Sequence, residues 1–320
     1  MIGAQFSSRD FLAVGEEAFV APNETTQFAL FTVQEFDVGF AQIEAAGRYE
    51  RVDVESDPLA LERDFDLFSG AVSLAGDLED DKGRIGLTVS RSERAPAGEE
   101  LFANGPHIAT QTFEVGDPNL DVESAWGVEA FIRMSQGGAT FNVAGFLQAF
   151  DNYIFLDPTG EEEDELPVFQ FLQSSAQFFG FEADANIPLI EKDGYGLTAD
   201  LRASYVEAKL SGDVTGPVPR IPPLSLLGAL DADFDAFTLR GEVQHFGGQQ
   251  SVREFETTTE SFTFVNAYLS WRPLENNENV VLQLAGENLF DTTGRRHSSF
   301  TKDFVTLPGR NIRVSARLNF

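Results

Sequence analysis

The last ten residues of the chain, NIRVSARLNF (311–320), alternate strictly between apolar and polar side chains. A period of two collects alternate residues on one face of a β-strand, whereas a helix would scatter them around its circumference. The apolar set on this segment is Ile312, Val314, Ala316, Leu318 and Phe320. The same alternation recurs in FAQIEAAGRYE (40–50), RIGLTVS (84–90), GLTADLRASY (196–205), TFVNAYLSWR (263–272) and VVLQLAGE (280–287). The chain is therefore predicted to be all-β.

The predicted strands are long, and their connections alternate in length. We count about fourteen strands, many of about ten residues or more, which is the length a tilted strand needs to cross a bilayer. Short turns are predicted at 36–39, 77–83, 136–138, 191–194, 233–236 and 275–279. Longer polar loops are predicted at 13–25, 55–63, 95–124, 156–167, 211–222, 247–261 and 291–310. This alternation is typical of a transmembrane antiparallel β-barrel with short periplasmic turns and long external loops.

The closing strand shows how such a barrel would place its two faces. Every backbone polar group in hydrocarbon needs a partner, so the sheet has to close. Arg313 and Arg317 are predicted to face a watery interior, because an arginine on the lipid face costs about 2–4 kcal/mol near the midplane. The alternate residues would then meet lipid, with Phe320 at the interface.

Composition narrows the choice of partners. The formal net charge of −30 argues against a nucleic-acid partner, which requires a cationic face. The chain has no cysteine, no run of about 18 apolar residues, and no signal peptide in MIGAQFSSRDFLAVG. Alternating strands with polar loops are also compatible with a soluble, acidic, β-rich binding module.

Three longer motifs identify a resemblance. Residues 91–133 run RSERAPAGEELFANGPHIATQTFEVGDPNLDVESAWGVEAFIR, residues 216–226 run GPVPRIPPLSL, and residues 285–320 run AGENLFDTTGRRHSSFTKDFVTLPGRNIRVSARLNF. All three resemble TonB-dependent outer-membrane receptors. The resemblance implies a Gram-negative outer-membrane transporter whose partners are membrane lipid, the TonB complex and a scarce metal or metal chelate.

Family members combine an N-terminal plug domain, a TonB-coupling segment and a barrel of twenty-two strands. Residues 1–320 resemble the C-terminal portion of that barrel, without the plug domain, the coupling segment and about eight strands. A truncated barrel that does not transport is therefore a further alternative. No G-x-S-x-G, P-loop or H-E-x-x-H motif occurs, so we do not expect an enzyme.

The stretch ELFANGPHIATQTFE (100–114) suggests a cargo. Its Gly-Pro-His resembles the zinc-uptake branch of the family, in which the loop histidine is a candidate metal ligand; this role would pass to His107. An imidazole is a good Zn²⁺ donor, and Glu99, Glu100, Glu114 or Asp117 could add carboxylate oxygen. The spacing of the three histidines supports no site by itself, and a full site would need ligands from the plug. A plain hydrogen-bonded loop histidine and a ferric siderophore cargo remain open.

An acidic run, TGEEEDELP (159–167), lies in a predicted external loop. Hard cations such as Ca²⁺ take several oxygen ligands, so a loop ion is one interpretation. A solvated acidic loop is the other, since charge runs usually face water. We expect no resident cofactor; Zn²⁺ or Ca²⁺ would bind as cargo or as a loop ion.

Overall fold

The computed structural model describes residues 1–15, 18–78, 82–254, 256–274 and 279–318. Within these residues one antiparallel sheet dominates, accompanied by a single turn of 3-10 helix, η1 (Asp57–Leu59), and one short helix, α1 (Gly98–Phe102). None of the described helices is long and apolar enough to cross a membrane. The strands are β1 (Ile2–Phe11), β2 (Asn23–Asp37), β3 (Gln42–Ser56), β4 (Leu61–Asp77), β5 (Gly83–Arg94), β6 (Asn104–His107), β7 (Thr112–Val115), β8 (Glu123–Gln136), β9 (Ala139–Glu163), β10 (Leu166–Lys192), β11 (Tyr195–Ser211), β12 (Thr215–Pro217), β13 (Ser225–Phe234), β14 (Phe237–Phe246), β15 (Phe262–Trp271), β16 (Val280–Glu287) and β17 (Asn311–Leu318).

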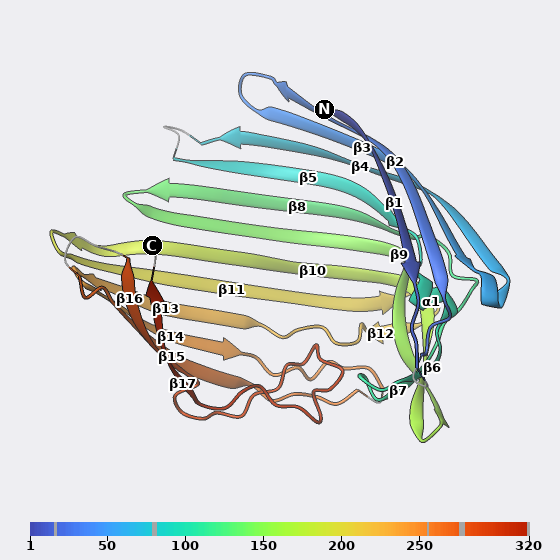
Figure 1. Ribbon diagram of the computed structural model, residues 1–320. Helices are drawn as coiled ribbons and strands as arrows, with labels where there is room; N and C mark the ends of the chain where they lie inside the picture. Colours follow the sequence, from blue (N-terminus) through green and yellow to red (C-terminus); the bar gives the residue numbers. More distant parts are fainter. Residues whose placement is uncertain (16–17, 79–81, 255, 275–278, 319–320) are drawn as a thin grey trace.

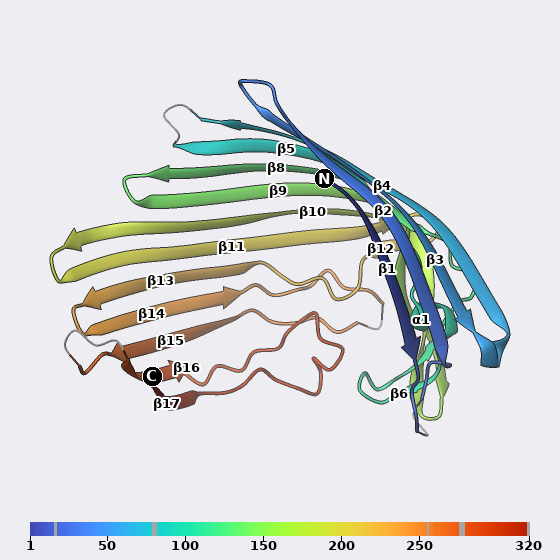
Figure 2. The same cartoon turned by 45° about the horizontal axis from the view of Figure 1, so that its top comes forward.

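The sheet is an up-and-down meander that curls into a trough (Figures 1 and 2). Neighbouring long strands pair in chain order, β5 pairing with β8 and β11 with β13, while short β6, β7 and β12 lie at one end. Among the described residues β1 pairs only with β2 and β17 only with β16, so no ladder closes the sheet. The predicted all-β antiparallel fold is confirmed.

Connections of different length gather at opposite ends of the sheet, as predicted. The short turns lie at the left in Figure 1, and the long loops lie toward the other end. Parts of the turns at 77–83 and 275–279 fall outside the described residues.

Two predicted loops are wrong. Residues 156–167 belong to the β9–β10 hairpin, whose two-residue turn uses Asp164 and Glu165 at positive φ of 50° and 63°. Two consecutive residues with positive φ form the hairpin turn whose twist matches that of the paired strands, so the ladder runs almost to the tip. Residues 55–63 form only a tight connection through η1, which Ala60 ends in the left-handed conformation. In both segments polar composition hid the strand, because strand ends beyond the apolar band face water.

The face of the sheet that carries no loops, called the outer face here, is apolar across the strands. Residues paired across a ladder share a face. The register aligns Ala316 with Leu282, and Val314 with Leu284. It continues the same row across β14 and β15 through the pair Leu239 and Leu269. Val314 is 77% exposed and Leu239 is 44% exposed. The predicted apolar face is therefore confirmed through Leu318; Phe320 lies outside the described residues.

The opposite, inner face is polar along the strands. Arg240 on β14 donates to Asp200 (3.0 Å) and Asp231 (2.6 Å) on the two preceding long strands. Glu242 accepts from Arg240 (3.1 Å) and from Asn266 on β15 (2.8 Å). A row of charged side chains is costly against lipid and is accommodated by water, which agrees with the predicted watery interior.

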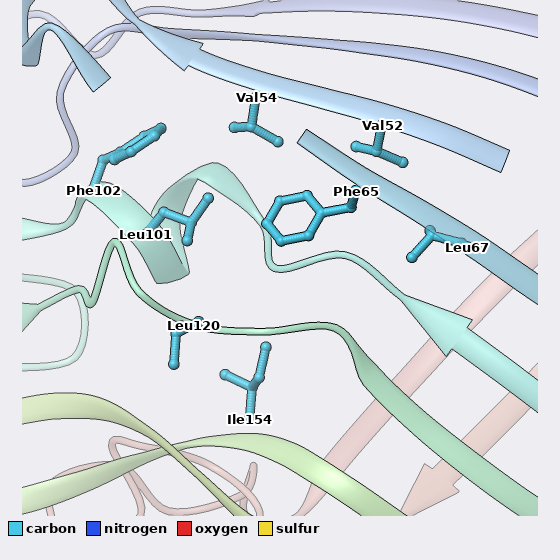
Figure 3. Close-up of a cluster of buried hydrophobic side chains, with 8 residues drawn as sticks. All are labelled: Val52, Val54, Phe65, Leu67, Leu101, Phe102, Leu120 and Ile154. Carbon is cyan, nitrogen blue, oxygen red and sulfur yellow. The ribbon is translucent and has the colours of Figure 1, made fainter. Parts of the chain in front are cut away.

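The packed core lies where loops fold onto the inner face near the long-loop end. One cluster brings Leu101 and Phe102 of α1 against Val54 of β3 and Phe65 of β4, with Val52, Leu67, Leu120 and Ile154 completing it (Figure 3). A second cluster comprises Phe155, Ala176, Ala208, Leu210 and Val218. Burying each valine, leucine, isoleucine or phenylalanine of these clusters contributes roughly 1.5–3 kcal/mol, which fixes the loops in place.

Candidate functional site

The hairpin of β6 and β7 places the predicted metal-site segment against the inner face. β7 runs parallel to β10, with Phe113 opposite Val168 and Glu114 opposite Phe169. The amide of Asn104 donates to the carbonyl of Phe19 (2.7 Å), which ties the hairpin to the loop between β1 and β2. Because backbone pairing holds both sides, the side chains of the hairpin have fixed directions.

His107 and Glu114 meet across this hairpin. The Nδ1 atom of His107 lies 2.8 Å from Oε1 of Glu114. The same oxygen accepts from the hydroxyls of Thr110 (3.0 Å) and Thr112 (3.1 Å). The imidazole stacks on Phe19, with ring centroids 4.1 Å apart and an interplanar angle of 13°.

These contacts determine which imidazole nitrogen is available. The carboxylate of Glu114, which is only 5% exposed, is an acceptor. The Nδ1–H group of His107 therefore donates a hydrogen bond to it. The Nε2 atom has no hydrogen bond to any described residue, and in the neutral form of the ring it is the nitrogen that carries the lone pair. A carboxylate behind a histidine is the arrangement that orients metal-binding imidazoles.

The other predicted ligands lie apart from this pair. Oε2 of Glu100 accepts from the amide of Ala97 (2.7 Å) and from Arg94 (2.7 Å), where it caps α1. Glu99 is half-buried on the same helix. In the described part of the chain no group of three or more His, Asp or Glu side chains is arranged to hold a metal ion. Of the five candidate ligands, the structure thus brings two into direct contact, His107 and Glu114.

Beside the hairpin, an ion-pair cluster joins the external loops; we call Asp157, Arg253, Glu256, His297 and Lys302 the loop ion-pair cluster. Oε1 of Glu256 lies 2.9 Å from Nζ of Lys302 and 3.1 Å from Nε2 of His297. Nε of Arg253 donates to Asp157, which lies toward the tip of the β9–β10 hairpin (3.0 Å). The cluster therefore fastens the loops after β14 and β16 to each other and to that hairpin.

The protonation of Glu256 follows from these contacts. Burial alone would raise the pKa of Glu256, but hydrogen bonds from His297 and Lys302 outweigh burial and lower the pKa to about 2. The carboxylate is therefore ionised at neutral pH, and Lys302, which is 4% exposed, has its counter-charge.

A cavity of about 120 Å³ lies between the hairpin and the loop ion-pair cluster. Its lining includes Thr110 and Thr112 of the hairpin together with Arg220, Phe300 and Lys302. Sequence reasoning missed this group because its members are separated by up to about 190 positions, and no spacing marks them. The only signal was that Arg220 lies in GPVPRIPPLSL, a motif already singled out.

The acidic run at 159–167 forms the tip of the β9–β10 hairpin. Glu161, Glu162 and Glu163 are exposed. Among the described residues of this tip, as elsewhere in the described chain, no three acidic or histidine side chains are arranged to hold a metal ion. Its geometry is that of a solvated tip.

Comparison with known proteins is consistent with this fold. Residues 3–289 match the family described as TonB dependent receptor-like, beta-barrel. The copper transporter OprC superposes with a TM-score of 0.82 at 18% identity, covering 93% of this chain and 48% of OprC. The FrpB iron transporter from Neisseria meningitidis gives 0.75 at 12% identity, covering 100% and 53%. A mutant ferric enterobactin receptor (PfeA) from Pseudomonas aeruginosa, in complex with enterobactin, gives 0.71 at 17% identity, covering 100% and 51%. The chain spans about half the length of these proteins, and such identities show the fold alone.

Proposed function

The chain belongs to the TonB-dependent receptor-like β-barrel family, and we propose that it forms the C-terminal part of the wall of an outer-membrane receptor for a scarce metal or metal chelate. In this proposal the outer face meets acyl chains and the loops with His107 face the outside of the cell. The coupling partner of the whole receptor would be the TonB complex.

The outer face supports a membrane location. Leu230 is 51% exposed and Leu147 is 62% exposed, and both lie in a continuous apolar surface that spans the ladders. A soluble binding module rarely exposes such a large apolar patch, because hydration of that area is costly. This surface therefore favours the receptor over the soluble alternative.

The two open edges support a larger barrel. The outward N–H and C=O groups of β1 and β17 pair with no described strand of this chain. Unpaired backbone groups cost several kcal/mol each in hydrocarbon. We therefore propose that further strands complete the wall, toward the twenty-two that the family resemblance implies; self-closure of the fourteen long strands is the alternative.

The observation that carries the cargo assignment is His107. Its Nδ1 is held by Glu114, and its Nε2 has no hydrogen-bond partner among the described residues. The same hairpin lines a cavity among the long loops through Thr110 and Thr112. A neutral imidazole in this state suits Zn²⁺ and Cu²⁺. We propose His107 as a metal ligand and Glu114 as the group that orients it, with zinc as the first metal to test. The remaining ligands would come from other parts of the receptor or from the cargo itself.

Titration of the receptor that contains this chain, folded in detergent, with Zn²⁺ tests this assignment. We expect His107→Ala to abolish the tightest site and Glu114→Gln to weaken it about 10- to 100-fold through loss of orientation. Glu100→Gln, which removes a carboxylate occupied by Arg94, is the matched control and should leave zinc affinity unchanged. Wild-type affinity in His107→Ala would refute the assignment, and tight binding of a ferric chelate with no zinc binding would favour the siderophore alternative.

A further inference from the structure

Arg220 is half-buried, yet its guanidinium makes no hydrogen bond to a described residue. Its backbone amide donates to Glu256 (3.1 Å), and its Cζ atom lies 3.9 Å from the ring centroid of Phe300. Arg253, which lines the same cavity, is satisfied by Asp157 and by the carbonyl of Thr215 (2.8 Å).

The backbone and the ring fix the direction of Arg220. Its φ of 59° places the residue in the left-handed region, where the hydrogen bond of its amide to Glu256 holds it. The stack on Phe300 covers one face of the guanidinium and leaves its in-plane N–H groups free. These donors border the cavity of about 120 Å³, which has room for roughly four waters.

Most carboxylates around the cavity are already engaged. Asp157 is paired with Arg253, Glu256 with Lys302 and His297, and Asp303 accepts from Thr257 (2.7 Å). Glu254 also lines the cavity and is exposed, and its carboxylate makes no hydrogen bond or ion pair with a described residue. Burial also lowers the pKa of Arg220, which reflects the cost of holding this cation away from water.

Such a cation is stabilised by an acceptor with two oxygens. A guanidinium presents parallel N–H groups that match a carboxylate or a phosphate in a bidentate fashion. We infer that the cavity binds one oxyanion, the carboxylate or phosphate group of a ligand, with Arg220 as its bidentate donor and Phe300 as the platform that orients the donor.

The inference deepens the proposed function and rests on it for its biological meaning: the oxyanion is an arm of an anionic metal chelate. Thr110 and Thr112 line the cavity and also hydrogen-bond to Glu114, so the oxyanion site and His107 share one hairpin. A ligand with a carboxylate arm and a metal could therefore contact both.

Calorimetric titration of the full chain in detergent micelles with metal-free citrate and with inorganic phosphate tests the site. We expect saturable binding of at least one anion. Arg220→Gln should weaken it roughly 10- to 100-fold, the usual range for losing a charge-assisted hydrogen-bonded pair. Glu254→Gln should tighten it by several-fold, because one unpaired negative charge lining the cavity is gone. Stronger binding of citrate identifies a chelate arm, and stronger binding of phosphate identifies a phosphate-bearing ligand; each supports an oxyanion site.

Arg296→Gln is the charge-matched control. Arg296 lies in the loop after β16, is exposed, and its side chain makes no hydrogen bond or ion pair with a described residue. Equal weakening by Arg220→Gln and Arg296→Gln would show mere net-charge attraction and overturn the inference, as would absence of binding to wild type. Should Arg220→Gln fail to fold, Phe300→Leu retains the charge and is expected to weaken binding by several-fold; unchanged affinity there would also overturn the inference.

The zinc titration and the anion titration can refute their two proposals independently of each other. Anion binding through Arg220 without zinc binding at His107 would sink the proposed cargo and keep the oxyanion site. Zinc binding without anion binding would do the reverse.

Discussion

Replacing Glu256 by glutamine removes the negative charge that faces Lys302 inside the loop ion-pair cluster. Oε1 of Glu256 accepts from Lys302 at 2.9 Å and from His297 at 3.1 Å, and these two partners are only 4% and 2% exposed. Hydrogen bonds to charged groups contribute about 1.5–3 kcal/mol, and removing one partner of a buried ion pair costs about 3–5 kcal/mol. Since the glutamine oxygen keeps one acceptor, we expect local opening of the loops to become easier by about 3 kcal/mol.

Hydrogen exchange of loop amides measures this change. The amide of Thr259 donates to the carbonyl of Gln249 (3.1 Å), and its hydroxyl lies 3.0 Å from Nδ1 of His297. About 3 kcal/mol corresponds to roughly a 150-fold loss of protection at Thr259. Glu260→Gln, an exposed residue of the same loop, is the control and should change protection by less than about twofold. Unchanged protection in Glu256→Gln, or an equal loss in the control, would refute the reasoning.

Three further predictions concern pH and packing. The folded pKa of Glu256 is lowered to about 2, so the stabilisation by its carboxylate is complete above about pH 4.3, the ordinary pKa, and is lost as the pH falls toward 2. Protease sensitivity of the wild-type loops should therefore rise between these two pH values. The Glu256→Gln variant should lack this pH dependence. Leu101→Ala, at a position 2% exposed, should release α1 at a cost of about 2–5 kcal/mol by hydrogen exchange, whereas Leu12→Ala, 68% exposed, should not. Gly180→Ala should lower the unfolding midpoint, because its Cβ would lie 2.4 Å from a backbone oxygen of β11, whereas Gly241→Ala meets nothing within 4 Å and should be nearly neutral.

The apolar face was predictable because it is a local property. Alternation at Leu282 and Val314 already assigns each strand its two faces, and ladder pairing only aligns the rows. The same holds for Arg313, because the free energy of placing its charge against lipid is enough to exclude it from the lipid face. Strand ends beyond the apolar band carry no such signal, which is why Asp157 and Glu163 were assigned to a loop although both lie in β9.

The site was predictable only in part. His107 and Glu114 are seven residues apart, close enough for one hairpin to join them. Glu100, in α1, instead accepts a hydrogen bond from Arg94 at the end of β5. Glu256 and Lys302 come from different loops, and their meeting depends on how the whole sheet curls. Local pattern carries no information about such a contact.

The central claim, that the outer face meets lipid and the inner face meets water, can be measured directly because the chain has no cysteine. Single cysteines carrying spin labels would replace Leu87 and Val128 on the outer face, and Thr88 and Glu129, which are paired on the inner face. In bilayers we predict that labels at Leu87 and Val128 collide with oxygen dissolved in the acyl chains, while labels at Thr88 and Glu129 collide with a water-soluble nickel chelate. The reverse pattern, or water access at all four positions, would contradict the account.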